Sequence, residues 1–515
     1  MSVDASVANR ARRNTISDAF RRSAVRNGTQ PALRFADRAW SYGELDRAVD
    51  RVAGKLLSLG LAPGARVGGY GRNSDAYFIL WLACTRAGLT HVPINYALTE
   101  SELGYIVTQS GASVLVYDKA LEAVAGQMRG RAALKFLGTF ADGGDIDVLA
   151  TATGGDGDPV EVEQGDEDLV QITYTSGTTA MPKGAMMTHR AQLAEYASCI
   201  VDLELSREDR WLAALPLYHT AQTHCFTMPA MLLGASTVLI EQPTPDVVLK
   251  LIEEHKVTSF FAPPTVWISL LRHPDFDTRD LSSVRNLYYG ASIMPVPVLQ
   301  ELRQRLPGVR VFNCYGQSEI GPLATVLRPE EHDARPSSAG RPVLNVETRV
   351  VDEDMNDVEP GEQGEIVHRS PQLLLGYWDK PEETEEAFAG GWFHSGDIGV
   401  RDEEGYLYVV DRVKDIIKTG GTMVASREVE EVLFTHPSVS EVAVIALPDP
   451  KWIEAVTAVV VLRAGHSGDE GALIQHARQS LAPFKVPKRV IFVDNLPRNT
   501  AGKLLKRELR ATYAG

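Results

Sequence analysis

The sequence predicts an α/β protein in which a large N-terminal domain of parallel-sheet subdomains precedes a small α+β C-terminal domain. Three observations lead to this prediction. The chain has 515 residues, which is too long for one ordinary core and suits about three compact units. Its N-terminal part alternates β-rich runs with helical stretches. The part after residue 415 mixes helical and strand-like stretches.

Three short β-rich runs lie between residues 32 and 117, namely ARVGGY, THVPIN and ASVLVY. Amphipathic stretches at 42–59 and 75–87 flank the first of these runs. Because parallel strands need crossover connections, the alternation predicts a parallel sheet with crossover helices. Residues 141–165 are rich in Gly and Asp, which predicts a loop or a joint between subdomains.

The C-terminal elements are predicted from shorter patterns. A helix is expected at 426–436, because Val429, Val432 and Leu433 share one face. The other expected elements are strands at 442–446, 455–462 and 490–493 and a helix at 472–481.

Composition excludes some classes of function. The chain has 52 basic and 67 acidic residues, a net charge of −15, so a nucleic-acid partner is not expected. The segment 482–512 is locally basic, and a solvated final helix is the preferred interpretation for most of its cations. No apolar run is long enough to span a membrane, and the N-terminus lacks the apolar core of a secretory signal.

The four cysteines, Cys84, Cys199, Cys225 and Cys314, show no spacing typical of a metal or redox site. We therefore expect a reduced, cytoplasmic protein. The oligomeric state is left open between a monomer and a homodimer.

The stretch YTSGTTAMPKGAMMTH, residues 174–189, is suited to phosphate binding. Hydroxyl and backbone N–H donors are concentrated in five consecutive small residues, and Lys183 adds a cation. The five residues are Thr175, Ser176, Gly177, Thr178 and Thr179. Pro182 and Gly184 stand where a Walker loop has Gly and Ser or Thr, so this is a different loop. A helical pattern begins at His189, and we expect the loop to connect a strand to a helix.

The whole string resembles the phosphate loop of the adenylate-forming family, which includes acyl-CoA synthetases, firefly luciferase and peptide-synthetase adenylation domains. Other family landmarks follow in the family order: LPLYHTAQ at 215–222, YGAS at 289–292, NCYGQSE at 313–319, WFHSGD at 392–397, GYLYVVDRVKD at 405–415 and LPRNTAGK at 496–503. The resemblance runs from about residue 41 to residue 503.

The resemblance implies a nucleotide site. Tyr315 would stack on adenine, Ser318 would bond the α-phosphate, and Glu319 would hold Mg²⁺. Asp397 would accept both ribose hydroxyls, and Arg412 would be the second ribose contact. The other implied ATP or AMP contacts are the phosphate loop with Lys183, and Gly290, Ala291, Ser292, Asn313, Cys314, Gly316 and Lys503.

The implied catalytic residues are Lys503, Glu319, Thr175 and His219. His219 would lie beside the carboxylate that is activated. A zinc site of His219, His224 and Cys225 is not expected, because an i, i+5 spacing fits no helical ligand pair; a packed or hydrogen-bonded histidine is preferred.

The resemblance also implies two domains that change their relative orientation. The N-terminal adenylation domain would span residues 1–411 and the mobile domain residues 412–515. Lys414 would be the hinge, and Lys503 would enter the site only during adenylation.

The implied reaction activates a carboxylic acid with ATP and Mg²⁺, releases pyrophosphate, and transfers the acyl group from AMP to coenzyme A. The CoA contacts would be Gly420, Gly421, Trp452, Phe484, Lys485 and Lys488. Two departures affect the acceptor. Thr422, Met423 and Ser426 stand where Glu, Asn and Pro are common, and Ile453 follows Trp452 where Gly is usual. An acyl-AMP ligase that loads a carrier-protein phosphopantetheine is therefore kept as the alternative, and a luciferase-like oxygenase is a weaker one.

The acid is expected to be a medium- or long-chain fatty acid or another apolar acid. The default interpretation of the FFAPP run at 260–264 is a core strand, and the alternative is the wall of an apolar pocket. The substrate prediction uses that alternative: Phe260, Phe261, Trp267 and Met228 offer an apolar lining with no spare cation for a second carboxylate.

Overall fold

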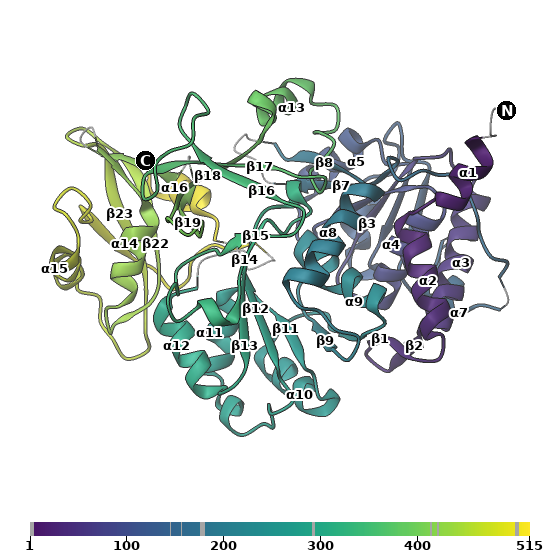
Figure 1. The fold of residues 1–515 in the computed structure, drawn as a ribbon, viewed down its shortest axis with the longest axis horizontal. Helices are drawn as coiled ribbons and strands as arrows, with labels where there is room; N and C mark the ends of the chain where they lie inside the picture. Colours follow the sequence, from purple (N-terminus) through teal and green to yellow (C-terminus); the bar gives the residue numbers. More distant parts are fainter. Residues whose placement is uncertain are drawn as a thin grey trace.

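The computed structural model describes residues 5–144, 146–155, 157–175, 181–290, 294–412, 415–419, 422–499 and 504–514. Within these residues the strands form four sheets (Figure 1). Three sheets belong to the part of the chain before residue 413, and the fourth belongs to the C-terminal part. The predicted α/β class, with a large N-terminal part and a small C-terminal one, is confirmed.

A six-stranded sheet has the order β6-β5-β3-β4-β7-β8. Its strands are β3 (Arg66–Tyr70), β4 (Thr90–Ile94), β5 (Val114–Tyr117), β6 (Phe136–Thr139), β7 (Leu169–Thr175) and β8 (Lys183–Thr188). The pairs β3–β4, β3–β5, β5–β6 and β4–β7 are parallel, as the alternating pattern predicts. The pair β7–β8 is antiparallel.

The segment between Thr175 and Lys183 therefore joins two strands. The expected passage from strand directly to helix is wrong, because Lys183–Thr188 pairs with β7 before α8 begins at His189. Strand β8 buries Gly184, Ala185, Met187 and Thr188, and so short a buried segment is compatible with a strand as well as with a helix start.

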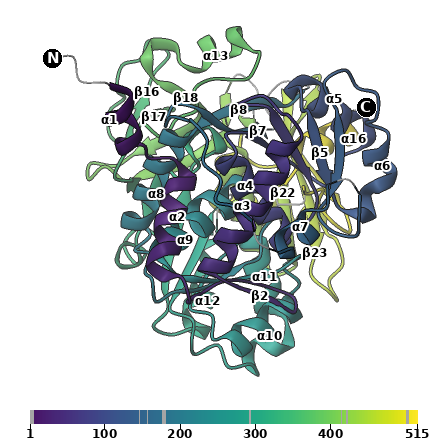
Figure 2. The ribbon, with the colours of Figure 1, turned by 90° about the vertical axis from the view of Figure 1, so that its right-hand side faces the viewer.

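A layer of helices lies between this sheet and the next one. It contains α2 (Ile16–Asn27), α3 (Tyr42–Ser58), α4 (Asp75–Arg86), α7 (Val148–Thr153), α8 (His189–Asp202) and α9 (Met228–Leu233), and α1 (Ala5–Arg12) precedes it. Figure 2 views the fold from the side on which α2, α3 and α4 lie. On the other face, α5 (Glu100–Ser110) and α6 (Glu122–Gly126) cover the sheet, with η1 (Lys119–Leu121) before α6.

Helix α3 has the predicted amphipathic pattern. Its start is fixed by a capping box, in which Ser41 and Glu44 bond each other's backbone N–H, a device that contributes about 1 kcal/mol. Helix α4 corrects the prediction, because all twelve of its residues are buried. Its end charges are paired instead of solvated: Arg38 donates two 2.7 Å hydrogen bonds to Asp75, and Arg86 bonds Asp46 at 2.6 Å.

A nine-stranded sheet has the order β15-β14-β13-β12-β11-β9-β10-β1-β2. Its strands are β1 (Pro31–Phe35), β2 (Arg38–Ser41), β9 (Arg210–Ala213), β10 (Ser236–Leu239), β11 (Ser259–Phe261), β12 (Asn286–Gly290), β13 (Arg310–Tyr315), β14 (Thr325–Leu327) and β15 (Arg341–Pro342). The core of its other face is formed with α10 (Pro245–His255), α11 (Pro264–Arg272) and α12 (Val296–Arg305). Short turns along it are η2 (Ala221–Thr227), η3 (Pro274–Asp277), η4 (Ser318–Ile320) and η5 (Pro329–Glu331).

A four-stranded antiparallel sheet closes the N-terminal part. It consists of β16 (Glu347–Val351), β17 (Gln363–Arg369), β18 (Phe393–Arg401) and β19 (Leu407–Arg412), in that order. Helix α13 (Pro381–Ala387) and η6 (Ala389–Gly391) lie between β17 and β18 in the chain.

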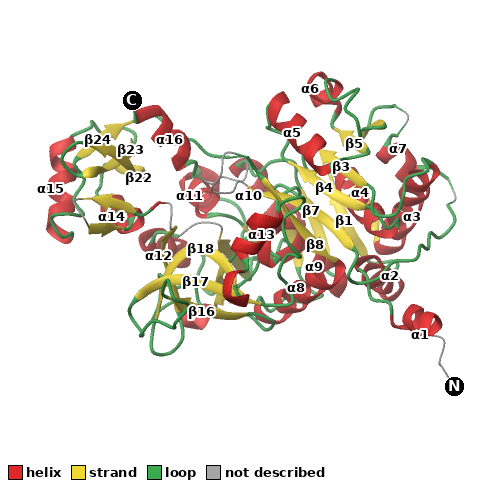
Figure 3. Ribbon diagram, turned by 90° about the horizontal axis from the view of Figure 1, so that it is seen from above, coloured by secondary structure: helices red, strands yellow, loops and turns green. Residues whose placement is uncertain are grey.

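The C-terminal part lies at one end of the molecule, away from α1 to α3 (Figure 3). Its sheet consists of β20 (Ile417–Thr419), β21 (Thr422–Val424), β22 (Val439–Asp449), β23 (Ile453–Leu462) and β24 (Arg489–Phe492). Its helices are α14 (Ser426–Phe434), α15 (Glu470–Ser480) and α16 (Lys506–Tyr513). Every element predicted in this part of the chain is confirmed.

The two parts meet where β19 ends. The buried carboxylate of Asp411 accepts 2.6 Å hydrogen bonds from the backbone N–H and the hydroxyl of Ser426, the first residue of α14. The basic residues near the C-terminus are largely paired within their own part: Lys506 with Glu430, and Arg510 with Asp415. The expectation of a solvated final helix is therefore wrong for these two cations, whose side chains are 12% and 28% exposed and ion-paired.

No helix of the part that the structure describes is long and apolar enough to cross a membrane.

Candidate active site

The centre of the candidate site is the carboxylate of Glu319. The hydroxyl of Thr175, at the end of β7, donates a 2.9 Å hydrogen bond to Glu319 Oε1. Tyr377 donates to the same oxygen at 3.4 Å, and burial raises the pKa of this phenol, so it stays a proton donor. Glu319 is only 9% exposed. A carboxylate surrounded by hydroxyl groups, whose oxygens can also bind a cation, suits a hard cation such as Mg²⁺.

Two sequence motifs meet beside this carboxylate. The hydroxyl oxygens of Ser318 and Thr220 lie 2.9 Å apart. Thr220 directly follows His219 and precedes the π-helical turn η2. The backbone N–H of Ala221 bonds His219 Nδ1 at 3.4 Å, which orients the imidazole at the start of that turn. The structure thus brings the LPLYHTAQ motif next to the YGQSE motif.

A second cluster forms around Asp397. Tyr315, the last residue of β13, donates a 2.8 Å hydrogen bond to Asp397 Oδ2. Arg412 Nε lies 3.3 Å from Asp397 Oδ1, because Asp397 and Arg412 are paired across β18 and β19. Burial, and secondly the Asp397 charge, raise the pKa of Tyr315. An aromatic ring, an acid and a guanidinium are thus assembled from two sheets, as the resemblance implies for a nucleoside.

Lys183 connects the phosphate loop to the Glu319 cluster. Its Nζ lies 5.1 Å from the centre of the Tyr377 ring, within the range of a cation–π contact. Two further implied contacts, both on β13, have partners within the protein. Asn313 Nδ2 donates to the Ser338 carbonyl at 2.8 Å, and the Cys314 side chain lies in the core.

Two glycines allow neighbouring backbone segments to approach each other closely at the site. A Cβ atom at Gly290 would lie 2.3 Å from the Cys314 carbonyl oxygen, and one at Gly316 would lie 2.0 Å from the Pro322 carbonyl oxygen. Any other residue at either position would push these segments apart.

Some of the predicted site residues lie outside the described part of the chain: Ser176, Gly177, Thr178, Thr179, Ala291, Ser292, Lys414, Gly420, Gly421 and Lys503.

The predicted CoA contacts that the structure describes form a cluster on the C-terminal part. Lys488 Nζ lies 5.0 Å from the Trp452 ring centre, and Lys485 Nζ lies 5.8 Å from the ring centre of Phe484. Both cations are already engaged. Lys485 bonds both carboxylate oxygens of Glu428 at 2.6 Å, and Lys488 donates to backbone carbonyls.

His224 fits the preferred interpretation of a packed histidine. Its Nε2 lies 2.8 Å from Gln171 Oε1 and its Nδ1 lies 2.8 Å from the Tyr196 hydroxyl, so both ring nitrogens are hydrogen-bonded within the protein. Burial lowers the pKa of His224 to about 3.

The prediction that Phe260, Phe261, Trp267 and Met228 together line one wall of a pocket is wrong. Phe260 and Trp267 pack on each other in the core beneath α10 to α12, with ring centres 4.9 Å apart. Phe261 belongs to the core around Trp211, and Met228 belongs to the helical layer. The default interpretation as core strands is the correct one, because packing between strands and helices buries these side chains almost completely.

Sequence reasoning did not identify Tyr377 and Thr220 as site residues. Tyr377 lies between β17 and α13, outside the motifs named above. Thr220 stands next to His219 inside a motif, and this adjacency is the signal that points to it.

Comparison with known proteins agrees with this geometry. Residues 20–378 match the model of the family described as AMP-binding enzyme, and residues 428–503 match the AMP-binding enzyme C-terminal domain. A feruloyl-CoA synthase of an Amycolatopsis species is 37% identical over 94% of this chain and 96% of its own length. A fatty acid–[acyl-carrier-protein] ligase, ScoC of Streptomyces coeruleorubidus, is 32% identical over 95% and 94%.

Among solved structures, the crystal structure of ATP-bound MatB from Rhodopseudomonas palustris is similar to this chain. It superposes with a TM-score of 0.90 at 31% identity and covers 97% of this chain and 99% of MatB.

Proposed function

Because this chain belongs to the AMP-binding enzyme family and carries that family's C-terminal domain, we propose that it activates an apolar carboxylic acid with ATP and transfers the acyl group to coenzyme A. The chain is an AMP-forming acid–thiol ligase. The observation that carries the proposal is that two clusters, Thr175 with Glu319 and Tyr315 with Asp397, both include residues of the single motif at 313–319.

In the first half-reaction, a carboxylate oxygen attacks the ATP α-phosphorus and pyrophosphate leaves. Catalysis of this displacement is mainly positioning and charge neutralisation, so no side-chain nucleophile is needed. Tyr315, Asp397 and Arg412 would hold the nucleoside. Thr175, Lys183 and Ser318 would contact phosphate oxygens, and His219 would lie beside the acid.

Glu319 would hold Mg²⁺, which when bound offsets negative charge on the phosphates. The hydroxyl donors Thr175 and Tyr377 fix the orientation of this carboxylate before any ligand arrives. Lys503 would bridge the acid and the phosphate during this step and leave afterwards.

In the second half-reaction, a thiol attacks the acyl carbon and AMP departs. We infer that residues 412–515 rotate about Lys414 between the two steps. Trp452 with Lys488 and Phe484 with Lys485 would bind the nucleotide end of CoA, with Gly420 and Gly421 over the acyl group.

For the substrate we propose a fatty acid of medium or long chain or an aryl acid. The support is that relatives named for ferulate and for fatty acid match over nearly the whole chain. The carrier-protein alternative is supported by ScoC and by the Thr422–Met423 departure.

The test is acid-dependent exchange of labelled pyrophosphate into ATP across fatty acids of increasing length, hydroxycinnamic acids, acetate and malonate. Each buried methylene contributes about 0.8 kcal/mol, so kcat/KM should rise about fourfold per carbon until the pocket is full. Activity with acetate or malonate above all others would contradict the proposal. Thioester formation with free CoA, compared with a pantetheinylated carrier protein, then decides the acceptor.

A further inference from the structure

Glu319 and Ser318 lie on a short turn that is held from outside the site. The turn runs from η4 to Leu323, and Gly321 within it has φ 105°, a left-handed conformation that favours glycine. The turn has two internal hydrogen bonds, from Ile320 N–H to the Gln317 carbonyl and from Gly321 N–H to the Ser318 carbonyl, and other backbone groups of the turn are bonded by side chains from outside. The side chains that hold it therefore decide where the Glu319 carboxylate points.

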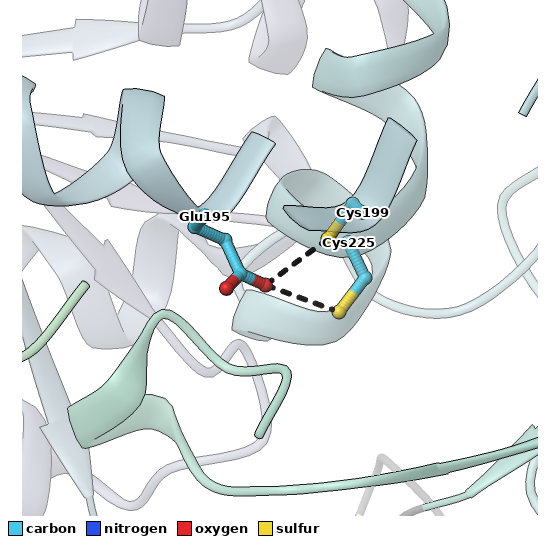
Figure 4. A group of neighbouring side chains, drawn as sticks. All are labelled: Glu195, Cys199 and Cys225. Atoms are coloured by element: carbon cyan, nitrogen blue, oxygen red, sulfur yellow. Dashed lines mark hydrogen bonds between the residues drawn. The ribbon is translucent and has the colours of Figure 1, made fainter. Parts of the chain in front are cut away.

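Glu195, on α8, is one of these side chains. It is fully buried, and its Oε1 accepts a 3.0 Å hydrogen bond from the backbone N–H of Leu323. A Cβ atom at Gly321 would lie 3.0 Å from Glu195 Oε2, so the carboxyl packs directly against the turn. The thiols of Cys199 and Cys225 also donate to Glu195 Oε1, at 3.2 and 3.6 Å (Figure 4).

Gln372, also fully buried, completes the arrangement from the segment after β17. Its Nε2 donates to the carbonyls of Ile320 at 3.2 Å and Leu323 at 3.0 Å, and to Glu195. Its Oε1 accepts from the Ser198 hydroxyl at 2.6 Å, which fixes the orientation of the amide.

The network is fully hydrogen-bonded and buried, which makes it rigid. Burial raises the pKa of the Cys225 thiol to about 11 and that of the Cys199 thiol well above its usual range, so both thiols remain protonated donors. Polar groups without partners are costly in a core, whereas a satisfied network specifies one arrangement. The arrangement specified here is that of the turn.

We propose that Glu195 and Gln372 are positioning residues for the adenylation step, because together they hold the turn that presents Glu319 to the metal and Ser318 to the α-phosphate. This inference rests on the proposed function and deepens it. Neither side chain touches the reacting atoms. They act through the backbone of Ile320 and Leu323, and the hydrogen bond from Leu374 N–H to the Glu319 carbonyl, 2.8 Å long, extends the same support.

The test compares Gln372→Leu with a matched control, Gln192→Leu. Gln192 is also fully buried and lies on α8, and its amide has no hydrogen-bond partner among the residues that the structure describes. Pyrophosphate exchange is measured against Mg²⁺ concentration at saturating ATP. Displacement of a catalytic group by about 1 Å costs about 100-fold. We expect the Mg²⁺ concentration for half-maximal exchange to rise about tenfold and the maximal rate to fall 10- to 100-fold.

Three further measurements separate positioning from general damage. Release of AMP from chemically prepared acyl-adenylate by the thiol acceptor should change less than threefold in Gln372→Leu. Glu195→Gln, which keeps an acceptor oxygen for Leu323 N–H, should lose less exchange than Glu195→Leu. Thermal unfolding of every variant is recorded. If Gln372→Leu does not fold, the Mg²⁺ dependence of pyrophosphate exchange is measured on Glu195→Gln instead.

An unchanged Mg²⁺ response in folded Gln372→Leu and in Glu195→Leu would overturn the proposal, as would equal loss in Gln192→Leu. Absence of acid-dependent exchange in the wild-type protein would instead contradict the proposed function.

Discussion

Tyr315 and Asp397 are 82 positions apart in the chain, and the hydroxyl of one donates a 2.8 Å hydrogen bond to the carboxylate of the other. The bond joins the last residue of β13 to the middle of β18, so it connects two different sheets. Together with Arg412 it fixes the Asp397 carboxylate in one orientation before a nucleotide binds.

The first prediction concerns this bond. Tyr315→Phe keeps the ring for stacking but removes the hydroxyl and its hydrogen bond. One such hydrogen bond contributes about 0.5–1.5 kcal/mol of net stabilisation. We expect the KM for ATP to rise about 3- to 10-fold in the exchange assay, with little change in kcat. Tyr406→Phe is the control, because Tyr406 makes a similar 2.7 Å bond to Glu331 outside the site. Equal effects of the two substitutions would argue against a nucleoside role.

The second prediction concerns the metal. Glu319→Gln keeps an oxygen that accepts from Thr175 and Tyr377 but removes the charge that would hold Mg²⁺. Adenylation should fall about 100- to 1000-fold, the usual loss for a preorganised electrostatic contact. Raising the Mg²⁺ concentration should restore part of the rate. A variant with full activity at low Mg²⁺ would show that the metal is bound elsewhere.

The third prediction concerns Lys503. Lys503→Ala should lower exchange about 100-fold or more, since it removes a positive charge at the transition state. Thioester formation from prepared acyl-adenylate should persist. If both half-reactions fall equally, Lys503 is structural and the two-orientation scheme does not hold.

The fourth prediction separates two roles of Lys485. If this cation binds CoA, it must compete with its ion pair to Glu428. Lys485→Met should raise the KM for CoA about 3- to 10-fold and leave exchange unchanged, because it removes binding made equally in ground and transition states. Glu428→Gln should lower that KM. A KM that stays constant in both variants would restrict Lys485 to a structural role.

The fifth prediction concerns pH. Burial lowers the pKa of both His91 and His224 to about 3, whereas an unfolded histidine has a pKa of about 6.5. Between these values the unfolded chain binds more protons, so the free energy of unfolding falls as pH decreases from about 6.5 towards 3.

Each histidine contributes a slope of about 1.4 kcal/mol per pH unit near pH 5. His224→Gln should therefore reduce the measured slope by about that amount in urea unfolding between pH 4.5 and 6. An unaltered slope would mean that His224 is protonated in the folded protein.

The sequence predicts the strands and the family motifs well, because both depend on local patterns. The β-rich runs become parallel strands, and the motif residues Thr175, Tyr315 and Arg412 lie at the ends of β7, β13 and β19. Helix α4 was misjudged since the pairing of Arg38 with Asp75 involves residues far apart in the chain. Its charges look solvated in the sequence, and they are buried in the fold.

The remaining errors have the same physical origin. The side chains of Phe260 and Met228 are apolar in any context, and only the packing of sheets and helices decides that they enter different cores. The pairing of Lys485 with Glu428 joins two segments 57 positions apart, which no local spacing reveals.

The adjacency of Asp411 and Arg412 on β19 has a thermodynamic consequence. Their side chains leave the strand on opposite faces, so one holds Ser426 of α14 and the other meets Asp397. If residues 412–515 rotate as proposed, the hydrogen bond between Asp411 and Ser426 breaks. Asp411 is the neighbour in the chain of Arg412, the proposed ribose contact. Binding of the nucleotide and domain orientation then form a reciprocal linkage. Suppose that one domain orientation, relative to the other, binds ATP more tightly than AMP by some factor. Replacing AMP with ATP then shifts the equilibrium between the orientations towards that one by the same factor, with neither acid nor thiol present.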